Sequence, residues 1–286
     1  MEFVKMHGLG NDFIITKASS FEEAAEFQPF ARFLCNRNFG IGGDGLVIIG
    51  KDNKADIFMR IFNSDGSEAE MCGNAIRCVA RLAYEEKMGR EKISVRTLAG
   101  LRYPEIVFDK EGRVDAVKVD MGEPMLERKF IPMTGEGSAV GVEADISSGA
   151  IKFTAVSMGN PHCIVFVDNI NDVPIEDWGR ELENHPLFPQ KTNVEFVQIL
   201  NKNEVIMRVW ERGAGITLAC GTGACATTVA GVLNNKTERQ VTVHLLGGDL
   251  YIEWNEEDNH VYMTGGAVEV FRGKIDLNKI SLMEAR

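Results

Sequence analysis

The segments Glu70–Ala83, EMCGNAIRCVARLA, and Leu218–Gly231, LACGTGACATTVAG, decide the fold. Each contains a cysteine followed at once by glycine, and then a run of small and apolar residues with helical spacing. A strand-like segment that ends in polar residues precedes each one, RIFNSDGSEAEMC before Cys72 and RVWERGAGITLAC before Cys220. The two cysteines are 148 positions apart (220 minus 72), about half of the chain. This repetition predicts two α+β halves that face each other.

Short strand-like segments recur along the chain, bounded by Gly, Asn or Asp, and several of them alternate apolar and polar residues. They are DIFMRIF, KISVRTL, YPEIVF, AVKVDM, FTAVSM, CIVFV, EVIMRVW, QVTVHLL and LYIEW. Helical periodicity is found in residues 21–36, 74–88, 174–184 and 222–234. We therefore expect sheets to dominate the fold, with two of the helices beginning directly after the Cys-Gly pairs.

The composition excludes several classes of protein. With 286 residues, 44% of them hydrophobic and 26% charged, the chain is long enough for two domains, each with its own core. The N-terminus lacks the apolar core of a signal peptide and no apolar run reaches membrane-spanning length, so we expect a cytoplasmic protein with no membrane partner. A formal net charge of −11 repels polyanions, so no nucleic-acid partner is expected, and an anionic ligand would need local donors.

The glycine-rich motif GIGGDG at Gly40–Gly45 formally matches a dinucleotide-binding fingerprint. It follows a helical pattern and precedes the strand-like LVII, which is the reverse of the strand-to-helix order that such a site needs. The motif instead predicts a turn that enters a strand, with Asp44 as a cap.

All six cysteines are expected to be reduced, because no C-x-x-C spacing occurs and a chain of this length does not need disulfides. A structural zinc site is the weaker alternative, since neither the Cys72/Cys78 nor the Cys220/Cys225 spacing is usual for zinc ligands. Cys72 and Cys220 fall at helix N-termini, where partial positive charge is expected to lower the thiol pKa. The remaining four are expected to pack in the core: Cys35, Cys78, Cys163 and Cys225.

Backbone N–H groups at Gly73–Asn74 and Gly221–Thr222 lack intrahelical acceptors at these helix starts, so each start can bind a carboxylate. A thiolate beside such an anion site suits chemistry at the α-carbon of an amino acid, and two facing sites would place a sulfur on each side of one carbon. Other polar residues are ambiguous from sequence alone. His162 in SMGNPHCIVF is more typical of a structural histidine, and Glu211–Arg212 in WERGAG of a surface ion pair.

Five blocks of sequence carry a family resemblance: KMHGLGNDF, IFNSDGSEAEMCGNAIRC, SMGNPH, NVEFV and ERGAGITLACGTGACA. In this order, and spread over essentially the whole chain, they resemble the motif series of the diaminopimelate epimerases. That family interconverts LL- and meso-diaminopimelate without pyridoxal phosphate, in bacterial lysine and cell-wall synthesis. The resemblance implies two pseudo-symmetric α+β domains, each a mixed sheet wrapped around a central helix, with the active site in the cleft between them. We place the Cys72 half in residues 1–120, completed by 265–286, and the Cys220 half in residues 121–264.

The resemblance also assigns the reacting groups. Cys72 and Cys220 match the two catalytic thiols, one of which abstracts the α-proton while the other donates a proton on the opposite face. Gly73–Asn74 and Gly221–Thr222 match the positions that hold the α-carboxylate. Neither a cofactor nor a metal is implied.

Further side chains match residues that assist the thiols or contact the substrate. His162 and Glu211 match groups that help the thiols lose or gain protons, and Glu211 is also expected to contact the substrate. The other substrate contacts, chiefly at the distal amino-acid end, are expected at Asn11, Asn63, Asn160, Asn193 and Arg212. The implied partners are diaminopimelate itself and a second copy of the chain in a homodimer.

The chain departs from the family pattern at Gly45, where some members have a polar side chain, and this puts one peripheral contact in question. Three other functions fit the sequence. One is a racemase of the same fold that uses two cysteines to act on proline or hydroxyproline. The others are a thiol hydrolase using Cys220 with His162, and a non-catalytic protein that binds amino acids.

Overall fold

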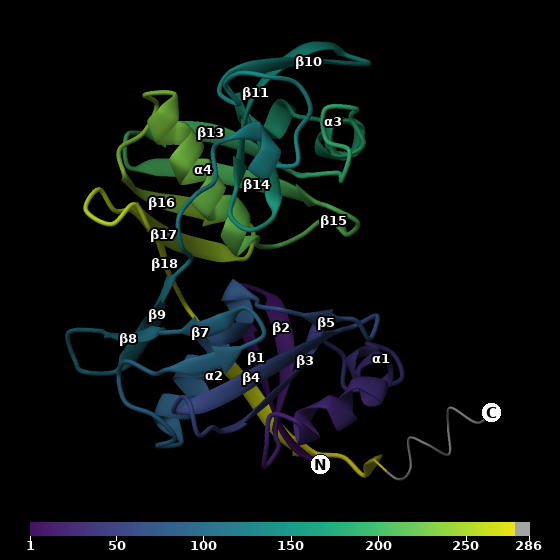
Figure 1. The fold of residues 1–286 in the computed structure, drawn as a ribbon, viewed down its shortest axis with the longest axis vertical. Coiled ribbons are helices and arrows are strands. Elements are labelled where there is room, and N and C mark those ends of the chain that lie inside the picture. Colours follow the sequence, from purple (N-terminus) through teal and green to yellow (C-terminus); the bar gives the residue numbers. More distant parts are fainter. Residues whose placement is uncertain (278–286) are drawn as a thin grey trace. The chain divides into compact units, whose positions relative to one another are not determined.

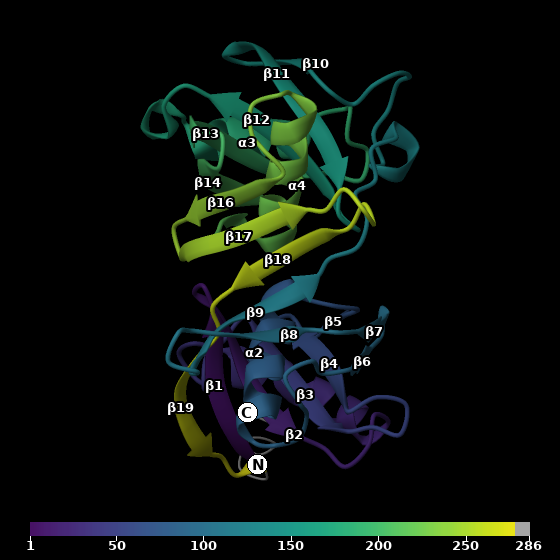
Figure 2. The same ribbon diagram turned by 90° about the vertical axis from the view of Figure 1, so that its left-hand side faces the viewer.

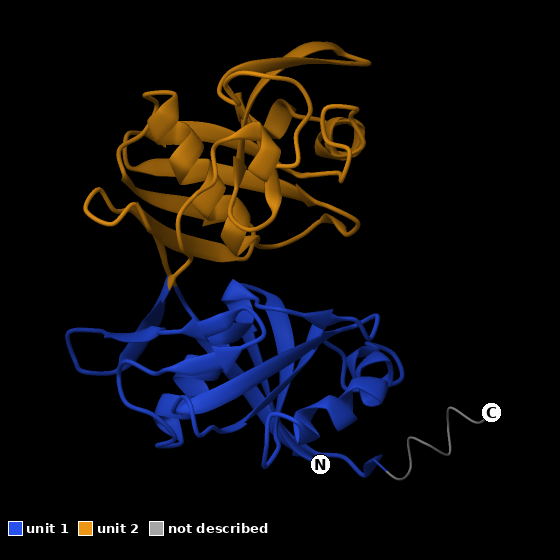
Figure 3. Ribbon diagram, in the orientation of Figure 1, with its two compact units in different colours: residues 1–119, 265–286 blue, residues 120–264 orange. Residues whose placement is uncertain are grey.

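The structure, a computed structural model, describes residues 1–277. Residues 278–286, which the sequence analysis assigned to the Cys72 half, lie outside the described part. The chain divides into two compact units (Figure 3). Unit 1 contains Met1–Val119 together with the chain from Gly265, and unit 2 contains Asp120–Thr264.

Unit 1 is built on a mixed sheet with strand order β19-β1-β2-β3-β4-β6-β7, and β5 pairs with β4 (Figure 1). The strands are β1 Glu2–Gly8, β2 Asn11–Lys17, β3 Gly45–Lys51, β4 Ile57–Asn63, β5 Glu68–Ala69, β6 Val95–Thr97, β7 Gly100–Arg102 and β19 Val268–Lys274. Strand β8, Glu105–Phe108, forms an antiparallel pair with β9, Val114–Asp120. The helices are the 3-10 helix η1 Glu23–Phe30, α1 Ala31–Cys35 and α2 Gly73–Glu85.

Unit 2 has a second mixed sheet with strand order β10-β11-β12-β13-β14-β16-β17-β18, and β15 pairs with β14 (Figure 2). The strands are β10 Val142–Ile146, β11 Gly149–Ser157, β12 Pro161–Val167, β13 Asn193–Asn201, β14 Glu204–Glu211, β15 Gly215–Ile216, β16 Gln240–Leu245, β17 Gly248–Trp254 and β18 Val261–Gly265. The helices are η2 Arg128–Phe130, η3 Ile170–Asp172, α3 Ile175–Glu183 and α4 Gly221–Leu233.

The two units repeat one sequence of strand pairings. In unit 1, β1/β2 is antiparallel, β2/β3 parallel, β3/β4 antiparallel, β4/β6 parallel and β6/β7 antiparallel. In unit 2, the pairs β11/β12, β12/β13, β13/β14, β14/β16 and β16/β17 follow the same alternation. The prediction of two pseudo-symmetric α+β halves, each with a mixed sheet, is therefore confirmed.

Helices α2 and α4 are the central helices of their units. Each has 13 residues, and each contacts several strands of its own sheet, β1, β2 and β4 for α2 and β11, β12, β13, β16 and β17 for α4. A helix covered on most sides cannot show the single apolar stripe of a surface helix. This explains why α4 is made almost entirely of Gly, Ala, Thr, Val and Cys, which are small enough to let the strands approach it closely.

Three of the four predicted helices are confirmed, as α2, α3 and α4. The prediction of one helix over residues 21–36 is wrong, because the chain there forms η1 followed by the five-residue α1. Pro29 lies inside η1, and a proline has no N–H for the hydrogen-bond ladder of a longer α-helix. The turn GIGGDG does enter strand β3 as expected, and Gly42 takes a φ of +83° there. None of the described helices is long and apolar enough to span a membrane.

Helix α3 packs tightly on the sheet of unit 2 at Gly179. A Cβ added to Gly179 would lie 2.6 Å from Cβ and Cγ of Trp210 on β14, whose indole N–H donates to Glu183 Oε2 at 2.7 Å. Since Cβ and Cγ of Trp210 cannot easily move away, we expect the clash in Gly179→Ala to cost about 2–3 kcal/mol, which exceeds the roughly 1 kcal/mol that alanine gains over glycine in a helix. The full chain should therefore lose about 1–2 kcal/mol of stability. Urea unfolding measures this change in the free energy of unfolding. The control is Asp177→Ala, an exposed change on the same helix that should lower the free energy of unfolding by only about 0.5 kcal/mol. A Gly179→Ala protein as stable as the wild type would show that this contact is looser than described.

Candidate active site

Both cysteines cap the N-termini of the central helices. Cys72 precedes α2 with φ −142° and ψ 121°, and Cys220 precedes α4 with φ −123° and ψ 109°, so both are extended N-cap residues. The first N–H groups of each helix, at Gly-Asn and at Gly-Thr, have no acceptor within the helix and form its positive end. Each cysteine therefore lies at a helix N-terminus, as the sequence predicted, and the binding of an anion at these helix starts stays a prediction.

In unit 1, the thiol of Cys72 is close to Asn11 at the start of β2. Cys72 Sγ lies 4.0 Å from Asn11 Oδ1, and Asn74 Nδ2 donates to the same oxygen at 3.1 Å. Asn11 Nδ2 donates to Asp44 Oδ2 at 2.7 Å. The carbonyl end of Asn11 is thereby directed towards the start of α2, and its amide end is held by Asp44.

Asp44 belongs to a network of charges behind Asn11. Arg37 donates to Asp44 at 2.8 Å and to Asp12 at 2.7 Å, and Lys5 lies 2.6 Å from Asp12. Burial by itself would raise the pKa of Asp12, but the hydrogen bonds from Arg37 and Lys5 lower it to about 2. Asp44 was expected only as a cap of the glycine-rich turn, and the structure instead makes it a support for Asn11.

Asn63, the last residue of β4, is exposed and donates through Nδ2 to Ser67 Oγ at 3.0 Å. Its side chain is thus engaged in the turn between β4 and β5. A role for Asn63 in binding substrate stays a prediction.

In unit 2, the sulfur of Cys220 is buried and its side chain is 6% exposed. It accepts a hydrogen bond from the N–H of Gly223 at 3.4 Å and lies 3.6 Å from Oγ1 of Thr222. The N-cap hydrogen bond fixes the sulfur against the first turn of α4.

A buried histidine–glutamate pair lies next to Cys220. His162 on β12 and Glu195 on β13 are both fully buried, and Nδ1 of the ring is 2.7 Å from Glu195 Oε1. The other ring nitrogen, Nε2, is 2.9 Å from Oδ1 of Asn160. One ligand-type atom from each of His162, Glu195 and Cys220 lies within 4.8 Å of the other two.

These three side chains are of the types that bind metal ions, and we tested their spacing against zinc. Zinc holds nitrogen and oxygen ligands at about 2.0–2.2 Å in a tetrahedral arrangement. Two ligand atoms 2.7 Å apart would subtend only about 80° at such an ion, well below the tetrahedral angle. A separation of 2.7 Å between the ring nitrogen and the carboxylate oxygen is that of a hydrogen bond, so His162 and Glu195 form a hydrogen-bonded pair beside the thiol.

The pKa of Cys220 is raised well above the ordinary value of a thiol, because burial disfavours the thiolate and the carboxylates of Glu211 and Glu195 add negative charge nearby. The expectation that the helix N-terminus lowers this pKa is therefore wrong for Cys220. The hydrogen bonds from Thr222 and Gly223 act in the expected direction but are outweighed. At neutral pH Cys220 rests as the neutral thiol.

Asn193, Glu211 and Arg212 lie at the adjoining ends of β13 and β14. Asn193 Nδ2 donates to the carbonyl of Pro161 at 2.9 Å, and Asn193 Oδ1 accepts from the backbone N–H of Arg212 at 3.0 Å. Arg212 is exposed and donates to the carbonyl of Gln190 at 3.1 Å, while Glu211 accepts a hydrogen bond from the hydroxyl of Thr217. The side chain of Asn193 thus connects Pro161 to the backbone of Arg212 and fixes the position of that backbone. A role for Asn193 in binding substrate stays a prediction.

The repeat of the fold places the candidate residues at equivalent positions in the two units. Each unit has an asparagine where its second strand begins, Asn11 and Asn160, and a polar residue where its fourth strand ends, Asn63 and Glu211. The parallel registers Phe13↔Gly45 and His162↔Asn193 align the strands between them. By this alignment, Phe13 and Val47 of unit 1 correspond to His162 and Glu195 of unit 2, so the buried histidine–glutamate pair has no counterpart at the equivalent positions of unit 1.

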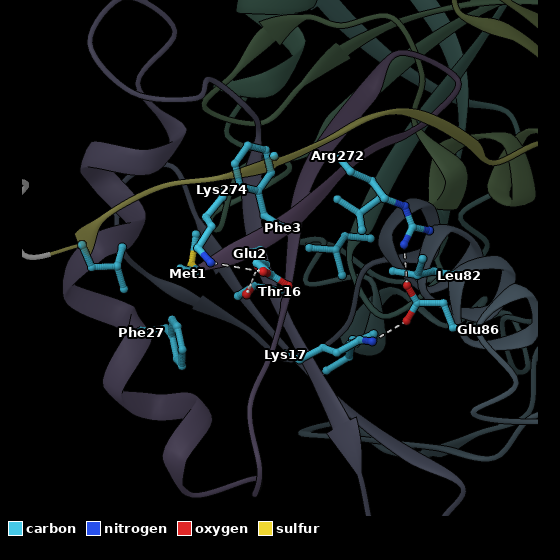
Figure 4. Close-up of a pocket in the computed structure, with 15 residues that line it drawn as sticks. Met1, Glu2, Phe3, Thr16, Lys17, Phe27, Leu82, Glu86, Arg272 and Lys274 are labelled. Atoms are coloured by element: carbon cyan, nitrogen blue, oxygen red, sulfur yellow. Dashed lines mark hydrogen bonds and ion pairs between the residues drawn. The ribbon is translucent and has the colours of Figure 1, made fainter.

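A hollow of about 940 Å³ in unit 1 lies elsewhere (Figure 4). Its lining includes Leu82 and Glu86, at the C-terminal end of α2, and Glu86 makes ion pairs with Lys17 at 2.5 Å and Arg272 at 2.8 Å. A helix of 13 residues is about 20 Å long, and Cys72 is at its other end. The hollow is therefore not part of the thiol site.

The family model described as diaminopimelate epimerase matches residues 3–127 and 154–270. The chain belongs to this family. A protein from Heliobacterium modesticaldum named diaminopimelate epimerase is 57% identical over 97% of this chain and 100% of its own length. A protein of the same name from Moorella thermoacetica is 54% identical over 97% of this chain and 100% of its own length. The protein is an isomerase of the epimerase type.

Solved structures with little sequence similarity share the fold. A hydroxyproline epimerase from Agrobacterium vitis aligns with a TM-score of 0.69 at 15% identity, covering 96% of this chain and 90% of that chain. A PhzF-family protein from Bacillus anthracis aligns with a TM-score of 0.69 at 17% identity, covering 96% of this chain and 99% of that chain. At this level of identity the likeness shows the fold alone.

The sequence analysis assigned no role at the thiols to Glu195 or Asp44, although the structure places Glu195 beside Cys220 and Asp44 behind Asn11. Glu195 lies inside the quoted block NVEFV, between the buried Val194 and Phe196 of β13. A charged residue within a run of buried strand positions was the available signal, because a buried carboxylate needs a partner. Its partner is 33 positions earlier in the chain, which no local pattern reveals.

The raised pKa of Cys220 predicts how this thiol reacts. Alkylation requires the thiolate, so a raised pKa moves the rise of the reaction rate to higher pH. We expect iodoacetamide to modify Cys220 half-maximally at a pH above about 8.5, the value for an unperturbed thiol. Mass spectrometry of the Cys220 peptide over a range of pH measures this, with the urea-unfolded chain as the control that should return to the ordinary value. Half-maximal modification below that pH in the folded chain would contradict the burial effect.

Proposed function

We propose that this protein catalyses the cofactor-independent epimerisation of LL-2,6-diaminopimelate to meso-diaminopimelate, in the synthesis of lysine and peptidoglycan precursors. The observation that carries the proposal is the repeated Cys-Gly helix start. Two units of one topology each place a cysteine as the N-cap of the central helix, within a chain that belongs to the diaminopimelate epimerase family.

The reaction requires two opposed proton-transfer groups. A single base cannot remove the α-proton and return one to the other face unless the substrate turns over, whereas two thiols on opposite faces can. We propose that Cys72 and Cys220 take these roles, and that the helix starts at Gly73–Asn74 and Gly221–Thr222 hold the α-carboxylate. The carboxylate gains enolate-like charge as the proton leaves, and helix N-termini stabilise that charge most in the transition state.

The surroundings of the two thiols suggest which of them carries a proton before the reaction begins. The raised pKa of Cys220 favours its neutral form, which is the form that donates a proton. Because the reaction needs one acid and one base, Cys72, which is half-buried, would then be the base in the same turnover. Donation by Cys220 leaves a thiolate there and a thiol at Cys72, so the reverse reaction begins from the product state.

The distal amino-acid end of the substrate needs polar partners. Arg212 is the best placed of the candidates for a carboxylate, because its guanidinium is exposed and its backbone is fixed by Asn193. Asn63 and Asn160 are proposed to add amide contacts. A site with such groups disfavours a substrate without a second amino-acid end, because the polar groups would remain unpaired.

The remaining expectations concern location and assembly. A cytoplasmic location and a homodimer stay predictions. The rival activity on proline or hydroxyproline shares the fold, as the hydroxyproline epimerase from Agrobacterium vitis does, but it does not need the distal contacts.

The two-thiol mechanism predicts the pattern of isotope incorporation in D2O. The donating thiol exchanges its proton with solvent, so early product should carry deuterium at the α-carbon while the remaining substrate carries little. Cys72→Ala and Cys220→Ala should each abolish epimerisation, and the core variant Cys78→Ala should retain it. NMR of LL- and meso-diaminopimelate, with L-proline as the competing substrate, provides the measurement.

Two results would overturn the proposal. Equal early labelling of substrate and product would indicate one base and a substrate that turns over. Turnover of proline in place of diaminopimelate would assign the protein to the rival activity.

A further inference from the structure

The glycine-rich turn GIGGDG, Gly40–Gly45, has no role in the proposed mechanism beyond leading the chain into β3. Its backbone packs closely against Lys5 of β1, a side chain that is largely buried. The carbonyl of Gly42 accepts a hydrogen bond from Lys5 Nζ, and a Cβ added to Gly43 would lie 3.0 Å from the same nitrogen. The turn therefore lies against the β1–β2 hairpin, and its next residue, Asp44, reaches the start of β2.

Asp44 binds the start of β2 with both its backbone and its side chain. Its N–H donates to the carbonyl of Asp12 at 2.7 Å, and its Oδ2 accepts from the N–H of Asp12 at 2.9 Å and from Asn11 Nδ2 at 2.7 Å. Its other carboxyl oxygen, Oδ1, accepts from Nη2 of Arg37 at 2.8 Å. A backbone N–H and a guanidinium can only donate. Both oxygens of Asp44 therefore serve as acceptors at this place.

The hydrogen bonds of Asn11 are satisfied in one orientation of its side-chain amide. Nδ2 donates to Asp44, and Oδ1 accepts from Asn74 Nδ2 at 3.1 Å. A reversed amide would place its oxygen where Nδ2 is, 2.7 Å from an oxygen of Asp44 that already accepts a backbone N–H, so two acceptors would face each other. In the orientation that makes both bonds, the carbonyl oxygen faces the start of α2 and lies 4.0 Å from Cys72 Sγ.

We propose that Asp44 is a positioning residue that keeps the amide of Asn11 in this orientation, and that the glycine-rich turn places Asp44 for that purpose. Asn11 in turn holds the side chain of Asn74 in the first turn of α2. With the amide of Asn11 reversed, its N–H groups would face those of Asn74, and two donors would meet at the helix start. The effect on catalysis rests on the proposed function of the α2 start. The orientation of Asn11 does not depend on that function.

The ion pair between Arg37 and Asp44 fits a positioning role better than a role in stability. The side chain of Arg37 is 59% exposed and that of Asp44 is 41% exposed. Ion pairs between exposed side chains contribute little to folding. Arg37 also donates to both carboxyl oxygens of Asp12, at 2.7 and 3.2 Å. One guanidinium thus holds two acidic side chains at once, which fixes the direction of the Asp44 carboxyl group.

Kinetics of variants test whether Asp44 acts through Asn11. Asp44→Ala removes the acceptor for Asn11 Nδ2, and we expect it to lower kcat/KM for diaminopimelate about tenfold, the scale of one lost hydrogen bond. Asp44→Asn, which retains one acceptor oxygen, should restore part of this loss. In a chain that already carries Asn11→Ala, the change Asp44→Ala should lower kcat/KM no further, because residues that act through one another are not additive.

A matched control lies in the same unit. Asp56, directly before β4, accepts from the N–H and the hydroxyl of Ser94 at 2.8 and 2.6 Å. It is at the opposite end of β4 from Asn63, about 20 Å along the strand. Asp56→Ala should leave kcat/KM unchanged, and it should remain folded by circular dichroism, as Asp44→Ala should.

The orientation of Asn11 can be measured without any substrate. In the full chain labelled with ¹⁵N-asparagine, Asn11→Ala identifies the side-chain signals of Asn11. In the wild type, saturation transfer from water should show one N–H of Asn11 that exchanges more slowly than those of the exposed Asn38, because it is bonded to Asp44. Asp44→Ala should remove this difference, and Asp56→Ala should leave it.

Four results would overturn the proposal. In the wild type, both N–H groups of Asn11 could exchange as fast as those of Asn38, and this result needs no variant of Asp44, so it tests the proposal even if Asp44→Ala does not fold. The others are slow exchange that persists in Asp44→Ala, wild-type kcat/KM in that variant, and an equal loss of kcat/KM when Asn11→Ala is already present. Slow exchange that disappears in Asp44→Ala, in a protein that does not act on diaminopimelate, would support the orienting role and reject the proposed function.

Discussion

The structure depends on one constraint, the enclosure of a helix by a sheet. Strands of each unit contact the central helix on several sides. A ligand can therefore reach backbone groups of this helix only at its two ends, where N–H and C=O groups lack partners within the helix. The first N–H groups of α2 and α4 must find partners there, and an anionic ligand is a suitable one. The same end collects residues from the strand termini, such as Asn11 and Asn160. The architecture alone therefore makes the N-termini of α2 and α4 the places where a ligand can bind.

The repeat gives two similar helix starts, but the polar groups around them differ. In unit 1 the thiol is half-buried, and its neighbour Asn11 is held by Asp44 and, through it, by Arg37 near the surface. In unit 2 the thiol is buried beside the His162–Glu195 pair. One backbone arrangement thus supports two electrostatic environments.

The sequence predicted those features that depend on local spacing. The Cys-Gly pairs marked both helix starts, and the 148-residue separation indicated the repeat. The helix over residues 21–36 could not be resolved by periodicity, because Pro29 interrupts the hydrogen bonds without changing the apolar pattern. Glu195 had no visible role because its partner comes from the neighbouring parallel strand, and parallel pairing joins residues that are far apart in the chain. The pKa of Cys220 depends on burial, which the sequence around a helix start does not report.

The high pKa of Cys220 is compatible with chemistry at carbon. The field of a helix N-terminus is worth about 0.3–1 kcal/mol at an exposed site, whereas burial shifts the pKa of a charged group by up to about 3–5 units, so burial decides the protonation state at rest. An α-proton is much less acidic than a thiol, and transfer becomes easier as the two acidities approach each other. A thiol with a raised pKa gives a stronger base once it is ionised and keeps its proton until the carbanion forms. The charge that ionisation creates then lies beside Thr222 and the N–H of Gly223 in the first turn of α4, and hydrogen bonds from these two groups favour the thiolate.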